Sequence, residues 1–172
     1  SQLFPYTSLF RSDPGINGAI SCIETEDWTL SIFDMPREPG RGDKNAVSPT
    51  GVAQLINRLS PDYVYVEDVW SSPQMGVTSA FNFGRSLGIV LGASASTAIL
   101  TLVKPTEWKA RTGTPKDKNQ ARRRAQQLFP CAFDVLKRAK DDGRAESAIL
   151  CFYGLFLNRL VPPKPLALKE FP

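Results

Sequence analysis

The alternation of strand-like and helix-like segments is the feature that most constrains how this chain can fold. Two β-type runs, residues 18–24 and 28–33, are separated by a polar turn and predict a hairpin. Residues 63–66 and 98–103 also have strand composition, and the segment between them, residues 75–93, predicts a long helix. Strands joined partly by a hairpin and partly by a helix predict a mixed α/β layer fold.

Caps and apolar spacing predict the other helices. Ser48-Pro49 begins one, and Pro61 ends it. We expect a short helix over residues 105–110, a basic helix over 116–129 and a final helix over 141–160, whereas the Pro- and Gly-rich residues 36–46 predict a loop.

Small residues recur every four positions in the long helix. This stripe predicts a close helix contact, either onto the sheet or across a two-fold dimer axis, and its members are Ala80, Gly84, Gly88 and Gly92.

Residues 1–12 need separate treatment. Ten of them, LFPYTSLFRS, resemble the translation of a common sequencing adapter, with one departure at Ser8. We therefore predict that residues 1–12 are a non-native prefix, which partly replaces a first strand leading into Asp13. The 172-residue length and 42% apolar content predict one domain over residues 13–172.

Composition excludes several classes of protein. No apolar run reaches membrane-spanning length, and no secretory signal is expected. The three cysteines are far apart, which argues against a disulfide framework or a zinc site and favours the cytoplasm. Because the chain has no histidine, acid-base or metal chemistry must use Asp and Glu, with Lys or Tyr assisting.

Positive charge is concentrated in one part of the chain. Residues 104–140 hold eleven Lys or Arg against three acids, so the rest of the chain is net acidic. A solvated helix face is the simplest explanation of such a run by itself. A basic block beside an acidic remainder is, however, also expected of a nucleic-acid-binding protein that keeps a carboxylate cluster.

Four acids stand at the ends of predicted elements. Asp13 precedes a Pro-Gly turn, Glu67 ends a strand, and Asp142 and Glu146 share one face of the last helix. That face continues through Ile149, Tyr153, Leu157 and Leu160, so the acids should point inward. Individually they could cap a turn, stabilise a helix N-terminus or pair with a lysine. Together, without cationic partners, they predict a site for Mg²⁺ or Mn²⁺, with two ions.

Ordered motifs along the chain resemble one known family. They are Asp13-Pro14-Gly15, PDYVYVEDVW at 61–70, SAFNFGRSLG at 79–88, VKPTEWK at 103–109, GTPKDK at 113–118 and DGRAE at 142–146. This set is similar to the RuvC family of Holliday-junction resolvases, and its last motif most resembles the phage-type members.

The resemblance implies an RNase H-like nuclease domain over residues 13–172, acting as a homodimer in a bacterial or phage-infected cell. It implies Mg²⁺-dependent paired nicking of four-way DNA junctions. Asp13 and Glu67 match the family's first two acids, and Glu146 matches the last. The third acid usually lies at the position of Gly143, so Asp142 substitutes for it, with Asp141 as the alternative.

The resemblance also indicates which residues contact DNA. Lys109 and Lys118 match basic positions near the scissile phosphate, and Trp70 matches an aromatic residue at the junction centre, whereas we expect Trp108 in the core. The remaining expected phosphate contacts are Lys116, Arg122, Arg123 and Arg124. Two other functions stay open: an RNase H-like nuclease for other branched or hybrid nucleic acids, and a metal-free junction-binding protein.

Overall fold

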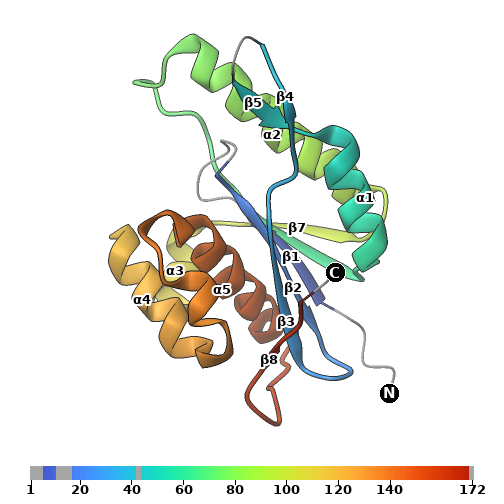
Figure 1. The fold of residues 1–172 in the computed structure, drawn as a ribbon, viewed down its shortest axis with the longest axis vertical. Helices are drawn as coiled ribbons and strands as arrows, with labels where there is room; N and C mark the ends of the chain where they lie inside the picture. Colours follow the sequence, from blue (N-terminus) through green and yellow to red (C-terminus); the bar gives the residue numbers. More distant parts are fainter. Residues whose placement is uncertain (1–5, 11–16, 42–43, 171–172) are drawn as a thin grey trace.

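A six-stranded mixed sheet forms the centre of the molecule (Figure 1). The computed structural model describes residues 6–10, 17–41 and 44–170. The strand order is β7-β6-β1-β2-β3-β8, and only β2 runs antiparallel to its neighbours. The bounds are β1 Tyr6–Phe10, β2 Ala19–Glu24, β3 Thr29–Asp34, β6 Tyr63–Glu67, β7 Ile99–Val103 and β8 Ala167–Leu168.

Helices cover both faces of this sheet. In Figure 1, α1 (Pro49–Leu59) and α2 (Val77–Ala95) lie on one side, and α3 (Pro105–Thr112), α4 (Lys118–Leu128) and α5 (Asp142–Leu157) lie on the other. Each layer has its own buried cluster, one around Ile56 and Val66 and the other around Trp108 and Ile149. The predicted mixed α/β fold is confirmed.

Two connections are more ordered than the sequence predicts. The segment expected to be a loop contains a small hairpin of β4 (Arg37–Pro39) and β5 (Asn45–Val47). Three 3₁₀ turns, Pro130–Ala132, Asp134–Leu136 and Ala139–Asp141, lead from α4 into α5.

The final helix is buried on nearly all sides because it lies between the sheet and the helices α3 and α4. Its glycines permit this: a Cβ on Gly154 would lie 2.5 Å from the Tyr65 ring, and one on Gly143 would lie 2.4 Å from the carbonyl oxygen of Asn17. The expectation of a single inward stripe is therefore too narrow. Leu157 also departs from it, since this residue is 41% exposed at the end of the helix.

Helix α2 packs inward with a different face from the one that carries the small residues. Its buried residues are Ser86, Val90 and Ser94, whereas a Cβ on Gly84, Gly88 or Gly92 would meet no atom within 4 Å. Packing of the stripe onto the sheet, one of the two predicted alternatives, is therefore wrong. The same exposed face carries Val77 and Phe81, which are 88% and 71% exposed.

Strand β1 falls within the predicted non-native prefix. Residues 6–10 pair with β2 along the whole strand and meet β6 at Tyr6 and Tyr63, so they stand where a central strand belongs. Within the described part of the chain, no helix is long and apolar enough to cross a membrane. All three cysteines are free.

Candidate active site

Two buried carboxyl groups from different layers are the centre of the candidate site. Glu67 is the last residue of β6, and Glu146 lies in the second turn of α5. Their residues are only 4% and 3% exposed, so both acids point inward as the sequence predicts. The charge of Glu146 contributes to raising the pKa of Glu67, so the two carboxyl groups lie near one another.

Glu67 is held by a neighbouring tryptophan. The indole Nε1 of Trp108 donates a hydrogen bond of 3.0 Å to its Oε1 atom. Burial raises the pKa of Glu67 to about 8, and the charge of Glu146 adds to the rise, while the bond from Trp108 and the ammonium of Lys109 oppose it. Without a further cation, this carboxyl group is therefore largely protonated at neutral pH.

Glu146 has one satisfied oxygen and one unsatisfied oxygen. The Nζ atom of Lys109 lies 2.8 Å from Oε1. The other oxygen, Oε2, is buried and has no hydrogen-bond partner among the described residues. An unpartnered buried carboxylate oxygen is costly, and it is the kind of ligand that a hard divalent cation prefers.

Asp142 also has a cationic partner. Its Oδ2 atom lies 2.9 Å from the Nζ atom of Lys118, and its side chain is 19% exposed. The expectation that the clustered acids lack cationic partners is therefore wrong for both Asp142 and Glu146. The lysines neutralise charge that would otherwise repel between the carboxylates.

Asp141 has a structural role instead. Its two carboxylate oxygens accept hydrogen bonds from the backbone N–H and guanidinium of Arg138, at 2.8 to 3.2 Å. These bonds hold the pKa of Asp141 below its usual value against the opposing effect of burial. Asp141 therefore caps the turn before α5, and Arg138 engages its carboxylate.

Gly143, beside Asp142, lies very close to a neighbouring backbone segment. A side chain there would collide with the carbonyl oxygen of Asn17 in the β1–β2 connection. With this backbone, position 143 therefore has no room for any side chain, an acid included.

The described residues include three of the four predicted metal ligands. Among them, no group of three or more His, Cys, Asp or Glu side chains could hold a metal ion. The first predicted ligand, Asp13, lies outside the described residues. Glu67 and Glu146 nevertheless fit such an ion, because both are oxygen donors and one buried oxygen lacks a partner.

The side chains predicted to contact DNA differ in their solvent exposure. Lys116, Lys118 and Arg123 are exposed. Arg122 instead donates to the carbonyl oxygens of Leu136 and Lys137, at 3.5 and 2.5 Å, and so supports the chain after α4.

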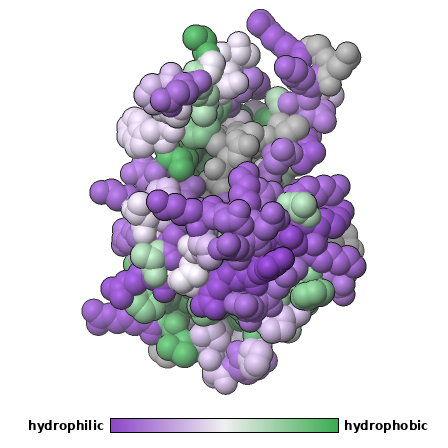
Figure 2. Space-filling view, turned by 90° about the vertical axis from the view of Figure 1, so that its left-hand side faces the viewer, coloured by the Kyte–Doolittle hydropathy of each residue, from purple (hydrophilic) through white to green (hydrophobic). Residues whose placement is uncertain are grey.

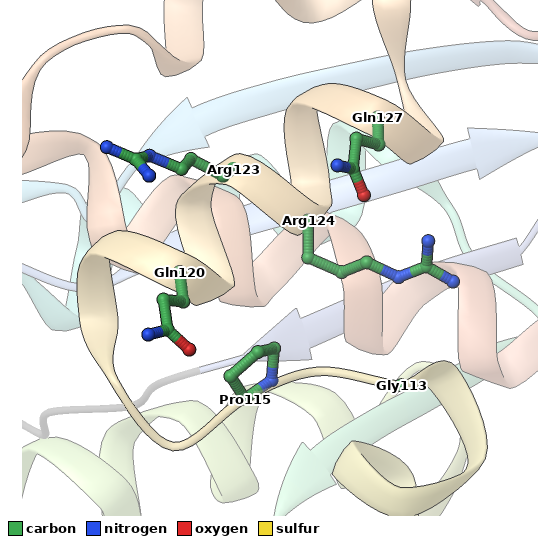
Figure 3. Close-up of a pocket in the computed structure, with 6 residues that line it drawn as sticks. All are labelled: Gly113, Pro115, Gln120, Arg123, Arg124 and Gln127. Carbon is green, nitrogen blue, oxygen red and sulfur yellow. The ribbon is translucent and has the colours of Figure 1, made fainter.

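A shallow hollow of about 350 Å³ lies between α4 and the loop after α3 (Figure 3). Arg124 extends across it, with Nε donating to the carbonyl oxygen of Thr112 at 3.0 Å. Of the residues that the structure describes, no acid lines the hollow, whose lining consists of Gly113, Pro115, Gln120, Arg123, Arg124 and Gln127. The surface on this side of the molecule is largely hydrophilic (Figure 2).

Two tryptophans occur in the motifs that resemble the RuvC family, and they lie in opposite environments. Trp70 is 84% exposed in the connection between β6 and α2, whereas Trp108 is fully buried, as predicted.

Comparison with solved structures identifies the fold. The structure of Thermus thermophilus RuvC in complex with a Holliday junction substrate aligns with 94% of this chain and 98% of its own, at a TM-score of 0.56 and 16% identity. The chain has a RuvC-like fold. A second T. thermophilus RuvC structure aligns with 88% of this chain and 95% of its own, at a TM-score of 0.52 and 15% identity. No family model and no curated protein matches the sequence.

Besides the lysine partners of Glu146 and Asp142, two further contacts of this RuvC-like fold were not predicted from the sequence. One is the bond from Trp108 to Glu67, and the other is the pairing of Arg144 with Asp34, whose two oxygens each accept at 2.7 Å. The second contact ties the first turn of α5 to the end of β3. Neither contact has a local signal in the sequence, because the first joins residues 41 apart and the second residues 110 apart.

Proposed function

We propose that this protein is a metal-dependent endonuclease that resolves four-way DNA junctions by paired, symmetric nicks. The main support is the buried pair Glu67 and Glu146, with its unpartnered oxygen, within a RuvC-like fold. The basic, acid-free surface of α4 adds a place for the phosphate backbone. The solved relative with a TM-score of 0.56 is bound to a Holliday junction, which supports the same substrate class here.

The ligands of the proposed metal site are Asp13, Glu67, Asp142 and Glu146. Mg²⁺ or Mn²⁺ bound there, as two ions, would supply the positive charge that stabilises the attacking and leaving oxygens of phosphodiester hydrolysis.

The two lysines of the site have separate tasks. Lys109 is mostly buried and orients Glu146, while its Nζ atom also lies 5.2 Å from the centre of the Trp108 ring. Lys118 is 65% exposed and can exchange Asp142 for a phosphate without moving its backbone. We propose that Lys118 contacts the phosphate nearest the cleaved bond.

A homodimer gives the enzyme two sites for two opposed cuts. The exposed face of α2 fits a second copy of the same helix, because Val77 and Phe81 protrude at one end while Gly84, Gly88 and Gly92 leave room at the other. An antiparallel pair about a two-fold axis would place each Phe81 over the partner's glycines. The exposed Trp70 would then be free to stack on an unpaired base at the junction centre.

A cleavage assay on a mobile four-way junction, with and without Mg²⁺, tests this function. We expect ligatable paired nicks that need the metal. Flap DNA and RNA·DNA hybrids serve as competing substrates, and faster cleavage of either would favour a different RNase H-like nuclease. Tight junction binding without metal-dependent cleavage would favour an architectural protein.

A further inference from the structure

The buried hydrogen bond between Trp108 and Glu67 joins two elements at the candidate site. Trp108 comes from the first turns of α3, and Glu67 ends β6. Trp108 is fully buried and Glu67 is 4% exposed, so water does not compete strongly for this 3.0 Å bond. An indole N–H can only donate, so its partner oxygen must accept.

Strand pairing fixes where this tryptophan stands. Glu67 lies opposite Val103 in the parallel register of β6 and β7, and the N–H of Asp68 donates to the Val103 carbonyl oxygen at 2.8 Å. Helix α3 begins two residues later at Pro105. The end of β6 and the start of α3 therefore form one rigid unit, and Trp108 has little freedom relative to Glu67.

Further contacts hold the tryptophan from the other side. The hydroxyl of Thr112 donates to the carbonyl oxygen of Trp108 at 2.8 Å, and the ring packs within the core cluster of α5. The neighbouring Lys109 reaches past the ring to Glu146. Two consecutive residues of α3 therefore hold one oxygen each of the two buried carboxyl groups.

We infer that Trp108 is a positioning residue: its indole N–H occupies Oε1 of Glu67 and turns the other carboxylate oxygen toward the metal site. This inference rests on the proposed metal-dependent function. Outer partners that orient a ligating carboxylate typically change metal affinity by about 10-fold to 100-fold when they are removed. Trp108 should therefore contribute to metal affinity without touching DNA.

Calorimetric titration of the full chain with Mn²⁺, without DNA, tests this role. Trp108→Phe removes the N–H and keeps an aromatic ring, and we expect Mn²⁺ to bind about 10-fold to 100-fold more weakly. Trp28→Phe is the matched control, because Trp28 is buried in the same core cluster and makes no described contact with either carboxylate. It should bind Mn²⁺ as the unaltered chain does.

A second variant separates positioning from folding. A tryptophan analogue with sulfur in place of the indole N–H, inserted at position 108, keeps the shape of the side chain and should show the same loss of Mn²⁺ affinity. Cleavage by either variant should recover at saturating Mn²⁺, so that the Mn²⁺ requirement changes more than the maximal rate.

The outcomes distinguish the inference from the proposed function. Unchanged Mn²⁺ affinity in the sulfur analogue would overturn the positioning role while leaving the nuclease intact. Equal weakening by Trp28→Phe would show that loss of core packing, rather than loss of the N–H, is responsible. If the unaltered chain binds no Mn²⁺, both the inference and the proposed function fail.

Discussion

Replacing Glu67 by Gln should stabilise the metal-free chain at neutral pH and leave it unchanged in acid. The pKa of Glu67 rises from 4.5 to about 8 on folding because the carboxyl group is buried. The folded state then keeps a proton that the unfolded state has released, so stability is full below about pH 4.5 and falls as pH rises toward 8. Gln resembles the protonated acid and cannot ionise, so it avoids this loss.

The size of the effect follows from the two pKa values. One pKa unit corresponds to about 1.4 kcal/mol, so the metal-free chain should lose about 2.5 kcal/mol relative to Glu67→Gln between pH 5 and pH 7. For a domain of this size, that corresponds to roughly 5 to 10 °C in melting temperature. Asp34 and Asp141, whose pKa values are lowered by their arginine partners, act in the opposite direction but are common to both chains.

Thermal melting in a chelator at pH 5, 6, 7 and 8 measures the difference directly. Glu26→Gln, the same change at an exposed turn residue, is the control and should melt in parallel with the unaltered chain. Mn²⁺ at pH 7 should raise the melting temperature of the unaltered chain, and it should raise that of Glu67→Gln by less. A constant gap between the two melting curves from pH 5 to pH 8 would refute the reasoning.

Four further changes test the proposed site and surfaces. Asp13→Asn should abolish cleavage and spare junction binding in a gel-shift assay, because metal ligation and phosphate contact use different residues. Lys118→Ala should lower the slope of log affinity against log salt by about one, and an unchanged slope would leave the exposed ammonium without a phosphate partner. Gly88→Leu should leave the fold of each protomer intact, because a Cβ there meets no atom, but should yield a monomer in sedimentation. Trp70→Ala should slow junction cleavage in a timed assay and leave the fold intact, and unfolding would contradict its 84% exposure.

The secondary-structure elements could be predicted from the sequence more completely than the side-chain contacts between them. Runs of β-type residues and helix caps predicted the order of the elements. The errors are in the first and last residues of individual elements. The basic helix begins at Lys118 rather than at residue 116, because the side chain of Asp117 accepts from the N–H of Gln120 and caps it. The β4–β5 hairpin was missed since its strands are only three residues long and lie within a charged loop.

The sequence predicted the acids of the candidate site but not the residues that pair with them. Helical spacing and strand ends are local signals, and they placed Glu67 and Glu146 in the interior. The pairing of Glu146 with Lys109 joins residues 37 apart, and that of Asp34 with Arg144 joins residues 110 apart. Such pairs depend on how the layers stack, so the resemblance and the basic block assigned Lys109 to DNA without revealing its carboxylate partner.

The lysine partners of Asp142 and Glu146 also affect whether the protein can fold before it binds a metal ion. A site whose carboxylates already have counter-ions does not depend on an external cation to hold its layers together, unlike small domains that collapse only around zinc. Such a polypeptide can fold before it binds the proposed metal ions. A chelator should therefore leave the protein folded but unable to cleave DNA, and adding divalent ions again should restore the proposed cleavage activity.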